Sequence, residues 1–396
     1  MRVLFTLRGA TGHFHPLVPL AQAARAAGHE VAFALPSSFQ GPVTRLGFRW
    51  LAAGFEDSSP EYVRLLGQRD RLSGLERRTF YRRSHASVLG PRMVADLLRH
   101  CETWRPHVIV RDTQDYGGCI AAEVLGIPHA AHQAVAFAAS YAAVMAAPLA
   151  GLRAAYGLPP DPDLRMPERY LVLSPFPPAV DGSESAARPT LNPYRATPFD
   201  RSGDEGAPEW SLPVPGAPLV YATLGTAANT RTEILEAFVA ALRDARVNLV
   251  VTVGRDGNPE RFGPQPPHVR IERYIPQTLL FPRCDLVISH GGSNTMLAAL
   301  AHGLPQVMVP IAADQPDNAA RCEAAGVARV VPLAGASAAA IREAALAVLA
   351  DPSFRQSAER VRAQIAALPG PAQAVTLLER LARDREPIVA ARRETV

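Results

Sequence analysis

A histidine near the start of the chain lies in a glycine-containing turn, where its imidazole could act as a general base. The segment Gly9-Ala10-Thr11-Gly12-His13-Phe14-His15-Pro16 follows the first apolar run, Val3 to Leu7. Because histidine titrates near neutral pH, His13 at the end of a strand could take a proton from a hydroxyl group. A packed or helix-capping histidine would give the same pattern, and this segment alone does not separate the two interpretations.

A dinucleotide-binding turn also joins a first strand to a helix. In its G-x-x-G-x-x-G variant the third glycine lets the helix pack closely on the strand, and that position here is His15. The second apolar run ends at Leu35-Pro36 without the acidic residue that would bind a ribose hydroxyl. Both features argue against a dehydrogenase.

A general base needs a partner that orients it and stabilises its cation, and a carboxylate is the usual choice. Asp112 is the candidate, because it comes just after the apolar run Val108 to Val110 and therefore at the carboxyl end of a buried strand. Asp115 lies three residues further on and is the alternative. Either residue could instead be the N-cap of the helix expected from about Tyr116.

The most specific pattern is Ser289-His290-Gly291-Gly292-Ser293-Asn294-Thr295, between an apolar strand and a helix expected over 296–302. Its glycines expose backbone N–H groups at a helix N-terminus, which is an anion-binding arrangement. His290 and Thr295 add side-chain donors. The pattern predicts a phosphate site.

Alternating strands and helices must position these groups. Strands are expected over 3–7, 31–35, 108–110 and from about 127, with helices near 15–27 and 116–125. A second series has strands near 219–223, 247–253, 286–289, 306–309 and 328–331, and the C-terminal part from about 337 to 385 has helical spacing. This alternation predicts two α/β domains with parallel sheets, which bind ligands at the carboxyl ends of their strands.

Taken together, these motifs resemble the nucleotide-sugar-dependent glycosyltransferases of the GT-B fold, particularly bacterial enzymes that decorate natural products. The resemblance covers nearly the whole chain. It implies an N-terminal acceptor domain over 1–198, a linker over 199–217, a donor domain over 218–370, and a helix and tail over 371–396 that could pack back on the first domain. The two Rossmann-like domains would face each other across a cleft.

The resemblance also assigns roles to residues. Gly12, His13 and Pro16 match the family's Gly-His-x-x-Pro turn, which carries the catalytic base, and Asp112 matches its carboxylate partner. On the donor side, Thr226 would contact phosphate, the segment with Tyr274, Ile275 and Gln277 would hold the nucleotide base, and Asp314 and Gln315 would recognise the sugar. The diphosphate would bind the loop of His290, Gly291, Gly292, Ser293, Asn294 and Thr295.

Tyr274 stands where many relatives have tryptophan. It could stack on the nucleotide base more weakly than tryptophan would, or it could be an aromatic residue of the core. Ser293 replaces a tryptophan of plant members, whose donor preference therefore does not carry over.

The implied reaction is an inverting transfer from a UDP- or dTDP-sugar to a hydroxyl of a small, lipophilic acceptor. No Asp-x-Asp pair lies within the donor-side motifs to recruit a divalent cation, and Asp161-Pro162-Asp163 stands outside them, so no metal and no cofactor are expected. A GT-B nucleotide-sugar epimerase and a non-catalytic nucleotide-sugar binder remain the alternatives. Turnover would separate them.

Composition excludes several other classes. All 41 basic residues are arginine, they face 37 acidic residues, and no nucleic-acid-binding signature accompanies the net charge of +4. The four cysteines form no metal-like spacing, and the longest apolar tract, 134–152, is interrupted by Pro148. We expect a cytoplasmic protein without nucleic-acid or membrane partners. The arginine-rich stretch from Arg64 to Arg83 is either a solvated helix face or an acceptor-docking loop.

Overall fold

The computed structural model describes residues 1–56, 58–135, 139–182, 188–201, 213–226 and 229–390. The chain divides into two compact units. The first comprises Met1–Pro175, Ser183–Thr197 and Pro369–Val396, and the second comprises Phe176–Gly182 and Pro198–Leu368. The segment Phe176–Gly182 thus belongs to the second unit, although the sequence pattern assigned it to the first. Residues 202–212 of the expected linker lie outside the described residues.

The first unit contains a parallel sheet, which has seven strands in the described residues, ordered β3-β2-β1-β4-β5-β6-β7. Its strands are β1 (Arg2–Thr6), β2 (Glu30–Leu35), β3 (Arg49–Ala52), β4 (Val108–Asp112), β5 (His129–His132), β6 (Leu171–Ser174) and β7 (Leu191–Pro193). The central strands β1 and β4 are rich in β-branched and other apolar residues, as expected of strands covered on both faces.

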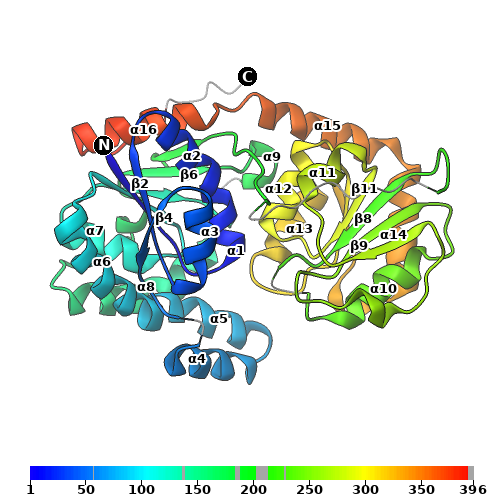
Figure 1. Cartoon of the computed structure of the whole chain (residues 1–396), viewed down its shortest axis with the longest axis horizontal. Helices are drawn as coiled ribbons and strands as arrows, with labels where there is room; N and C mark the ends of the chain where they lie inside the picture. Colours follow the sequence, from blue (N-terminus) through cyan, green and yellow to red (C-terminus); the bar gives the residue numbers. More distant parts are fainter. Residues whose placement is uncertain (57, 136–138, 183–187, 202–212, 227–228, 391–396) are drawn as a thin grey trace. The chain divides into compact units, whose positions relative to one another are not determined.

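Helices cover both faces of this sheet (Figure 1). They are α1 (Thr11–Phe14), α2 (Val18–Ala26), α3 (Gln40–Arg45), α4 (Pro60–Asp70), α5 (Gly74–Ser84), α6 (Gly90–Trp104), α7 (Tyr116–Val124), α8 (Ala139–Ala155) and α16 (Pro371–Asp384). A π-helical turn, His85–Leu89, joins α5 to α6. The last helix, α16, packs on α2, where Glu379 Oε1 lies 2.9 Å from His29 Nε2. Residues 391–396 of the expected tail are outside the described part of the chain.

The second unit repeats this architecture with a parallel sheet whose described strands number six, in the order β10-β9-β8-β11-β12-β13. Its strands are β8 (Leu219–Thr223), β9 (Asn248–Thr252), β10 (Val269–Glu272), β11 (Leu286–Ser289), β12 (Gln306–Met308) and β13 (Ala328–Val330). Its helices are α9 (Pro178–Asp181), α10 (Thr232–Leu242), α11 (Gln277–Leu280), α12 (Ser293–Ala301), α13 (Gln315–Ala324), α14 (Ala338–Ala350) and α15 (Pro352–Ala366). Helices α10 and α14 pack together, and α12 packs with α15.

Both sheets reverse their strand order at one point, between β1 and β4 in the first unit and between β8 and β11 in the second. Loops leaving adjacent strands at such a reversal turn to opposite faces of the sheet and open a crevice, where ligands of α/β proteins bind. The predicted base follows β1 and its partner ends β4, and the predicted phosphate loop follows β11. The topology therefore places both candidate sites at switch points.

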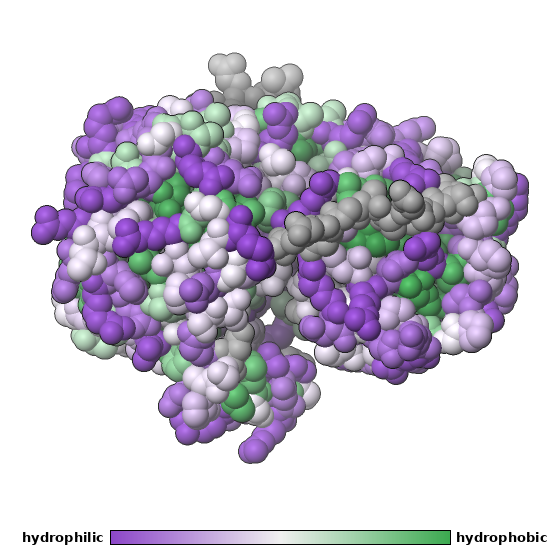
Figure 2. Space-filling view, in the orientation of Figure 1, coloured by the Kyte–Doolittle hydropathy of each residue, from purple (hydrophilic) through white to green (hydrophobic). Residues whose placement is uncertain are grey.

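The described residues include no helix that combines the length and apolar character needed to cross a bilayer. The arginine-rich stretch forms much of α4 and α5. Hydrophilic residues cover most of that segment in Figure 2, with a few apolar residues among them, and Val63 and Leu75 are exposed. Arg64, Arg71, Arg77 and Arg83 are also exposed, whereas Arg69, Arg78 and Arg82 are half-buried. Part of this stretch is a solvated face, and part faces the protein.

Candidate active site

The first site is built on a histidine that follows β1 and an aspartate that ends the neighbouring strand, β4. His13 lies within α1, which begins at Thr11, so the expected glycine turn is in fact the first turn of a helix. Asp112 is the last residue of β4 and is fully buried. The Nδ1–H of His13 donates a hydrogen bond to Oδ2 of Asp112. Residues 99 positions apart in the chain thus form one buried pair.

Backbone geometry fixes the other oxygen of Asp112. The N–H of Gln114 donates to Oδ1 at 2.9 Å, and the hydroxyl of Thr113 approaches the same oxygen at 3.3 Å. Burial alone would raise the pKa of Asp112, but His13, the N–H of Gln114 and the charge of Arg8 hold it well below its usual range. Asp112 is therefore an anion at neutral pH, and it can only accept the proton of His13 Nδ1.

The opposite nitrogen of His13 contacts Arg8, a residue that sequence reasoning did not select. Nε and Nη2 of Arg8 lie 3.0 and 2.7 Å from Nε2 of His13. A guanidinium has only donors, so Nε2 must be the unprotonated nitrogen and Nδ1 must carry the proton. The two partners thus define one tautomer, in which Nε2 has the lone pair that a general base needs.

Asp115, the alternative carboxylate, has a different role in the structure. Its Oδ1 accepts a hydrogen bond from the N–H of Gly118 at 2.9 Å and caps α7, as the capping interpretation predicts. Burial raises the pKa of Asp115, despite the polar groups around it. The geometry assigns the contact with His13 to Asp112.

The second site lies where β11 leads into α12. This helix begins at Ser293, three residues before the expected start, so Ser293, Asn294 and Thr295 form its first turn. Its N-cap is Gly292, and in the described structure no side chain caps it. The amides of the first turn therefore remain directed at the position where an anion would bind.

His290 is held against this turn by glycines. A Cβ atom on Gly225 would lie 2.8 Å from the imidazole, and one on Gly292 would lie 2.5 Å from it, so both positions require glycine. Gly225 follows β8 and has a φ of +64°, a conformation that glycine adopts readily. Burial lowers the pKa of His290 to about 4, so the ring is neutral at physiological pH. Thr226, next in the same turn, is exposed.

A buried network connects the phosphate loop to the predicted sugar-recognition turn. Ser293 donates to Oδ2 of Asp314 at 2.6 Å, and the amide of Asn318 contacts that oxygen at 2.8 Å and the carbonyl of Gly291 at 2.9 Å. Gln315 turns its Oε1 back to the N–H groups of Ile311 and Ala312. Asn318 was not selected from the sequence, because a buried amide has no signature in a single sequence.

The predicted base-binding segment lies beside the same loop. Nε2 of Gln277 donates to the hydroxyl of Thr295 at 3.0 Å, and the side chain of Ile275 is buried in the core, so Ile275 can offer a ligand only its backbone. Tyr274 is half-buried, its hydroxyl donates to the carbonyl of Asp200, and the guanidinium of Arg255 lies 3.8 Å from its ring centroid. Tyr274 is thus a partly exposed ring with a cation over one face rather than a core residue.

Asp200 also fixes this segment, although the sequence placed it in a linker. Its carboxylate accepts hydrogen bonds from the N–H and the hydroxyl of Thr278, both at 2.9 Å. Among the residues that the structure describes, no group of three or more His, Cys, Asp or Glu side chains is arranged to hold a metal ion.

Comparison with known proteins identifies the class. The family profile described as erythromycin biosynthesis protein CIII-like, C-terminal domain, matches residues 236–381. The glycosyltransferase SnogD of Streptomyces nogalater, a solved structure, superposes with a TM-score of 0.77 at 27% identity, covering 96% of this chain and 99% of that one. The spinosyn rhamnosyltransferase SpnG, solved with thymidine diphosphate, superposes with a TM-score of 0.78 at 27% identity, covering 96% of this chain and 100% of that one. The protein is a glycosyltransferase of the GT-B fold.

Curated relatives define the family more closely. The aklavinone 7-beta-L-rhodosaminyltransferase of Streptomyces galilaeus is 30% identical, with 98% of each chain covered. The TDP-daunosamine transferase DnrS of Streptomyces peucetius is 29% identical, again with 98% of each chain covered. The chain belongs to the family of antibiotic-biosynthesis glycosyltransferases, which transfer sugars from nucleotide-sugars.

The two carboxylates of the first site give a matched pair of variants. We expect Asp112→Asn to lower the transfer rate by about 10²- to 10⁴-fold, the range for a positioned general base, because the amide no longer fixes His13 in one tautomer. Asp115→Asn should lower the transfer rate much less, since asparagine is an equally good N-cap. Initial rates at saturating donor and acceptor measure both. The opposite order of the two losses would show that Asp115 is the functional carboxylate.

The ring of Tyr274 should contribute to nucleotide affinity. Tyr274→Ala is expected to weaken binding of thymidine diphosphate by about 1 to 3 kcal/mol, the usual loss for one base–aromatic stack. Tyr274→Phe keeps the ring and removes only the hydroxyl that contacts Asp200, so it should bind almost normally. Titration calorimetry gives both affinities, and equal losses in the two variants would assign the effect to the hydroxyl rather than to stacking.

Proposed function

We propose that this protein is an inverting, metal-independent glycosyltransferase that moves a sugar from a dTDP-sugar to a hydroxyl of a small, lipophilic natural-product acceptor. The observation that carries the proposal is the His13–Asp112 pair, in which Asp112 binds the Nδ1 proton and leaves the lone pair on Nε2. Such a pair suits proton removal from a hydroxyl. The relatives crystallised with thymidine diphosphate support thymine over uracil as the donor base.

The proposed reaction is a single displacement. His13 takes the proton of the acceptor hydroxyl, the oxygen bonds to the anomeric carbon, and the bond from that carbon to the diphosphate breaks. The departing diphosphate gains negative charge, which the first-turn amides of α12 and the donor groups of His290 and Thr295 can stabilise. Since these groups stabilise the leaving group, the reaction as proposed has no step that requires a divalent cation or a cofactor.

Stereochemistry and metal dependence test this proposal together. A panel of dTDP-sugars and UDP-sugars is incubated with a panel of hydroxylated aglycones, and products are detected by mass spectrometry. NMR of the anomeric proton should then show a β-glycoside from an α-linked donor, and EDTA should leave the rate unchanged. Retention of configuration would exclude a single displacement with His13 as base, and loss of turnover in EDTA would contradict the proposed stabilisation of the diphosphate by the protein alone.

A further inference from the structure

Arg8 occupies the space that the attacking hydroxyl must also approach. A general base has to come within about 2.6 to 3.2 Å of the hydroxyl oxygen whose proton it removes. Nε and Nη2 of Arg8 already lie within this range of His13 Nε2, at 3.0 and 2.7 Å. An acceptor oxygen that reaches Nε2 therefore also meets the guanidinium. The reaction takes place beside a fixed positive charge.

Tyr81 holds Arg8 in this position from the other side. The Nη1–H of Arg8 donates to the hydroxyl of Tyr81 at 2.5 Å, and the guanidinium of Arg69 lies 5.4 Å from the same ring. Burial would raise the pKa of Tyr81, but Arg8 and Arg69 keep it below its usual range, as expected for a phenol between two cations. Tyr81 can therefore keep its hydrogen bond to Nη1 of Arg8 while Nε and Nη2 move their hydrogen bonds from His13 to another acceptor atom.

Nε and Nη2 point the same way and form the fork with which a guanidinium binds negatively charged oxygen. We propose, on the basis of the proposed transfer reaction, that Arg8 determines acceptor specificity, by selecting an acidic hydroxyl, a phenol or an enol, over an aliphatic alcohol. The proton of this hydroxyl passes to His13 Nε2 while the oxygen receives the two N–H groups of Arg8. The oxygen then bonds to the anomeric carbon, and the electron pair of the broken bond leaves with the nucleoside diphosphate.

The preference follows from the charge on the attacking oxygen. An acidic hydroxyl has given up most of its proton when it attacks, so its oxygen carries substantial negative charge and gains most from a nearby cation. An aliphatic alcohol loses its proton late and carries little charge. It gains little from Arg8, and it must still displace Arg8 from His13. Arg8 therefore lowers the barrier more for the acidic hydroxyl than for the aliphatic alcohol.

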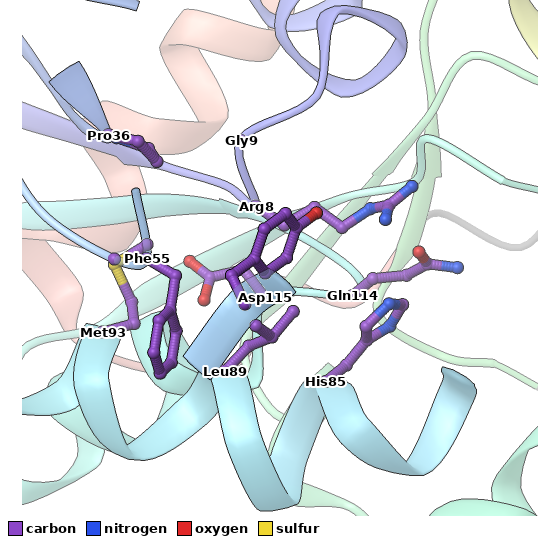
Figure 3. Close-up of a pocket in the computed structure, with 11 residues that line it drawn as sticks. Arg8, Gly9, Pro36, Phe55, His85, Leu89, Met93, Gln114 and Asp115 are labelled. Carbon is purple, nitrogen blue, oxygen red and sulfur yellow. The ribbon is translucent and has the colours of Figure 1, made fainter. Parts of the chain in front are cut away.

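The cavity beside Arg8 is lined by both apolar and polar side chains. Phe55, Met93 and Leu89 supply apolar walls, and Figure 3 shows Phe55 and Met93 on one side of the cavity with Gln114 and His85 on the other. His85 is 3% exposed, and within the described structure neither of its ring nitrogens has a hydrogen-bond partner. It lies in the π-helical turn between α5 and α6, a rare conformation that recurs at functional sites. Its nitrogens could bind a second polar substituent on an aromatic ring.

The test uses two acceptors of similar size and different acidity, 2-naphthol and decahydro-2-naphthol, with the dTDP-sugar that supports transfer in the panel. The unaltered protein should favour 2-naphthol. Arg8→Met should lower the rate with 2-naphthol by about tenfold or more, as expected when hydrogen bonds to a charged group are lost. The rate with the decahydro compound should change by less than about threefold. Tyr81→Phe, which releases only the tether, should shift the ratio in the same direction by a smaller factor.

Arg49→Met is the matched control, because Arg49 is an exposed arginine of β3 in the same unit, and it should leave the ratio unchanged. Circular dichroism and thymidine diphosphate affinity verify that each variant is folded. If Arg8→Met does not fold, the Tyr81→Phe ratio decides. Equal losses with both acceptors, or a preference of the unaltered protein for the decahydro compound, would overturn the role of Arg8 while leaving the proposed function intact. Absence of transfer to any hydroxyl would instead contradict the proposed function and this assignment with it.

Discussion

The chemistry of the first site depends on one buried hydrogen bond, from Nδ1 of His13 to Asp112. A neutral imidazole can place its proton on either nitrogen, and only one of the two forms has a basic Nε2. Asp112 selects that form because it is buried, ionised and unable to donate. The same bond joins α1 to the end of β4.

The second site relies on a comparable constraint, which is exerted by glycines and a helix end rather than by a charge. Gly225 and Gly292 leave room for the ring of His290, and the uncapped first turn of α12 directs its amides outward. Asn318 and Ser293 fix Asp314 against this turn. The groups proposed to stabilise negative charge are thus neutral dipoles and a neutral imidazole, whose orientation is fixed before any charge develops.

Much of the fold, and most residues of the two candidate sites, could be predicted from the sequence, because the site residues lie at the ends of strands with strong apolar patterns. The alternation of strands and helices predicted both parallel sheets, which the structure confirms. The Gly-Gly turn before α12 predicted a helix start with free N–H groups, and anion binding there stays a prediction. Arg8 and Asn318 were missed, since the contacts of a single side chain leave no periodic signal in the sequence. The start of α1 at Thr11 was also missed, because Gly9 and Gly12 favour a turn in isolation. The sequence favoured Asp112 over Asp115, and the structure places Asp112 in contact with His13.

The tautomer of His13 tests most directly whether Asp112 leaves the lone pair on Nε2. Selective ¹⁵N labelling of histidine, with His13 assigned by comparison with His13→Ala, gives the chemical shifts of both ring nitrogens near pH 8. The account predicts a protonated Nδ1 and an unprotonated Nε2 in the unaltered protein, and a mixture of the two tautomers in Asp112→Asn. A protonated Nε2 in the unaltered protein, or the same tautomer in both proteins, would contradict it.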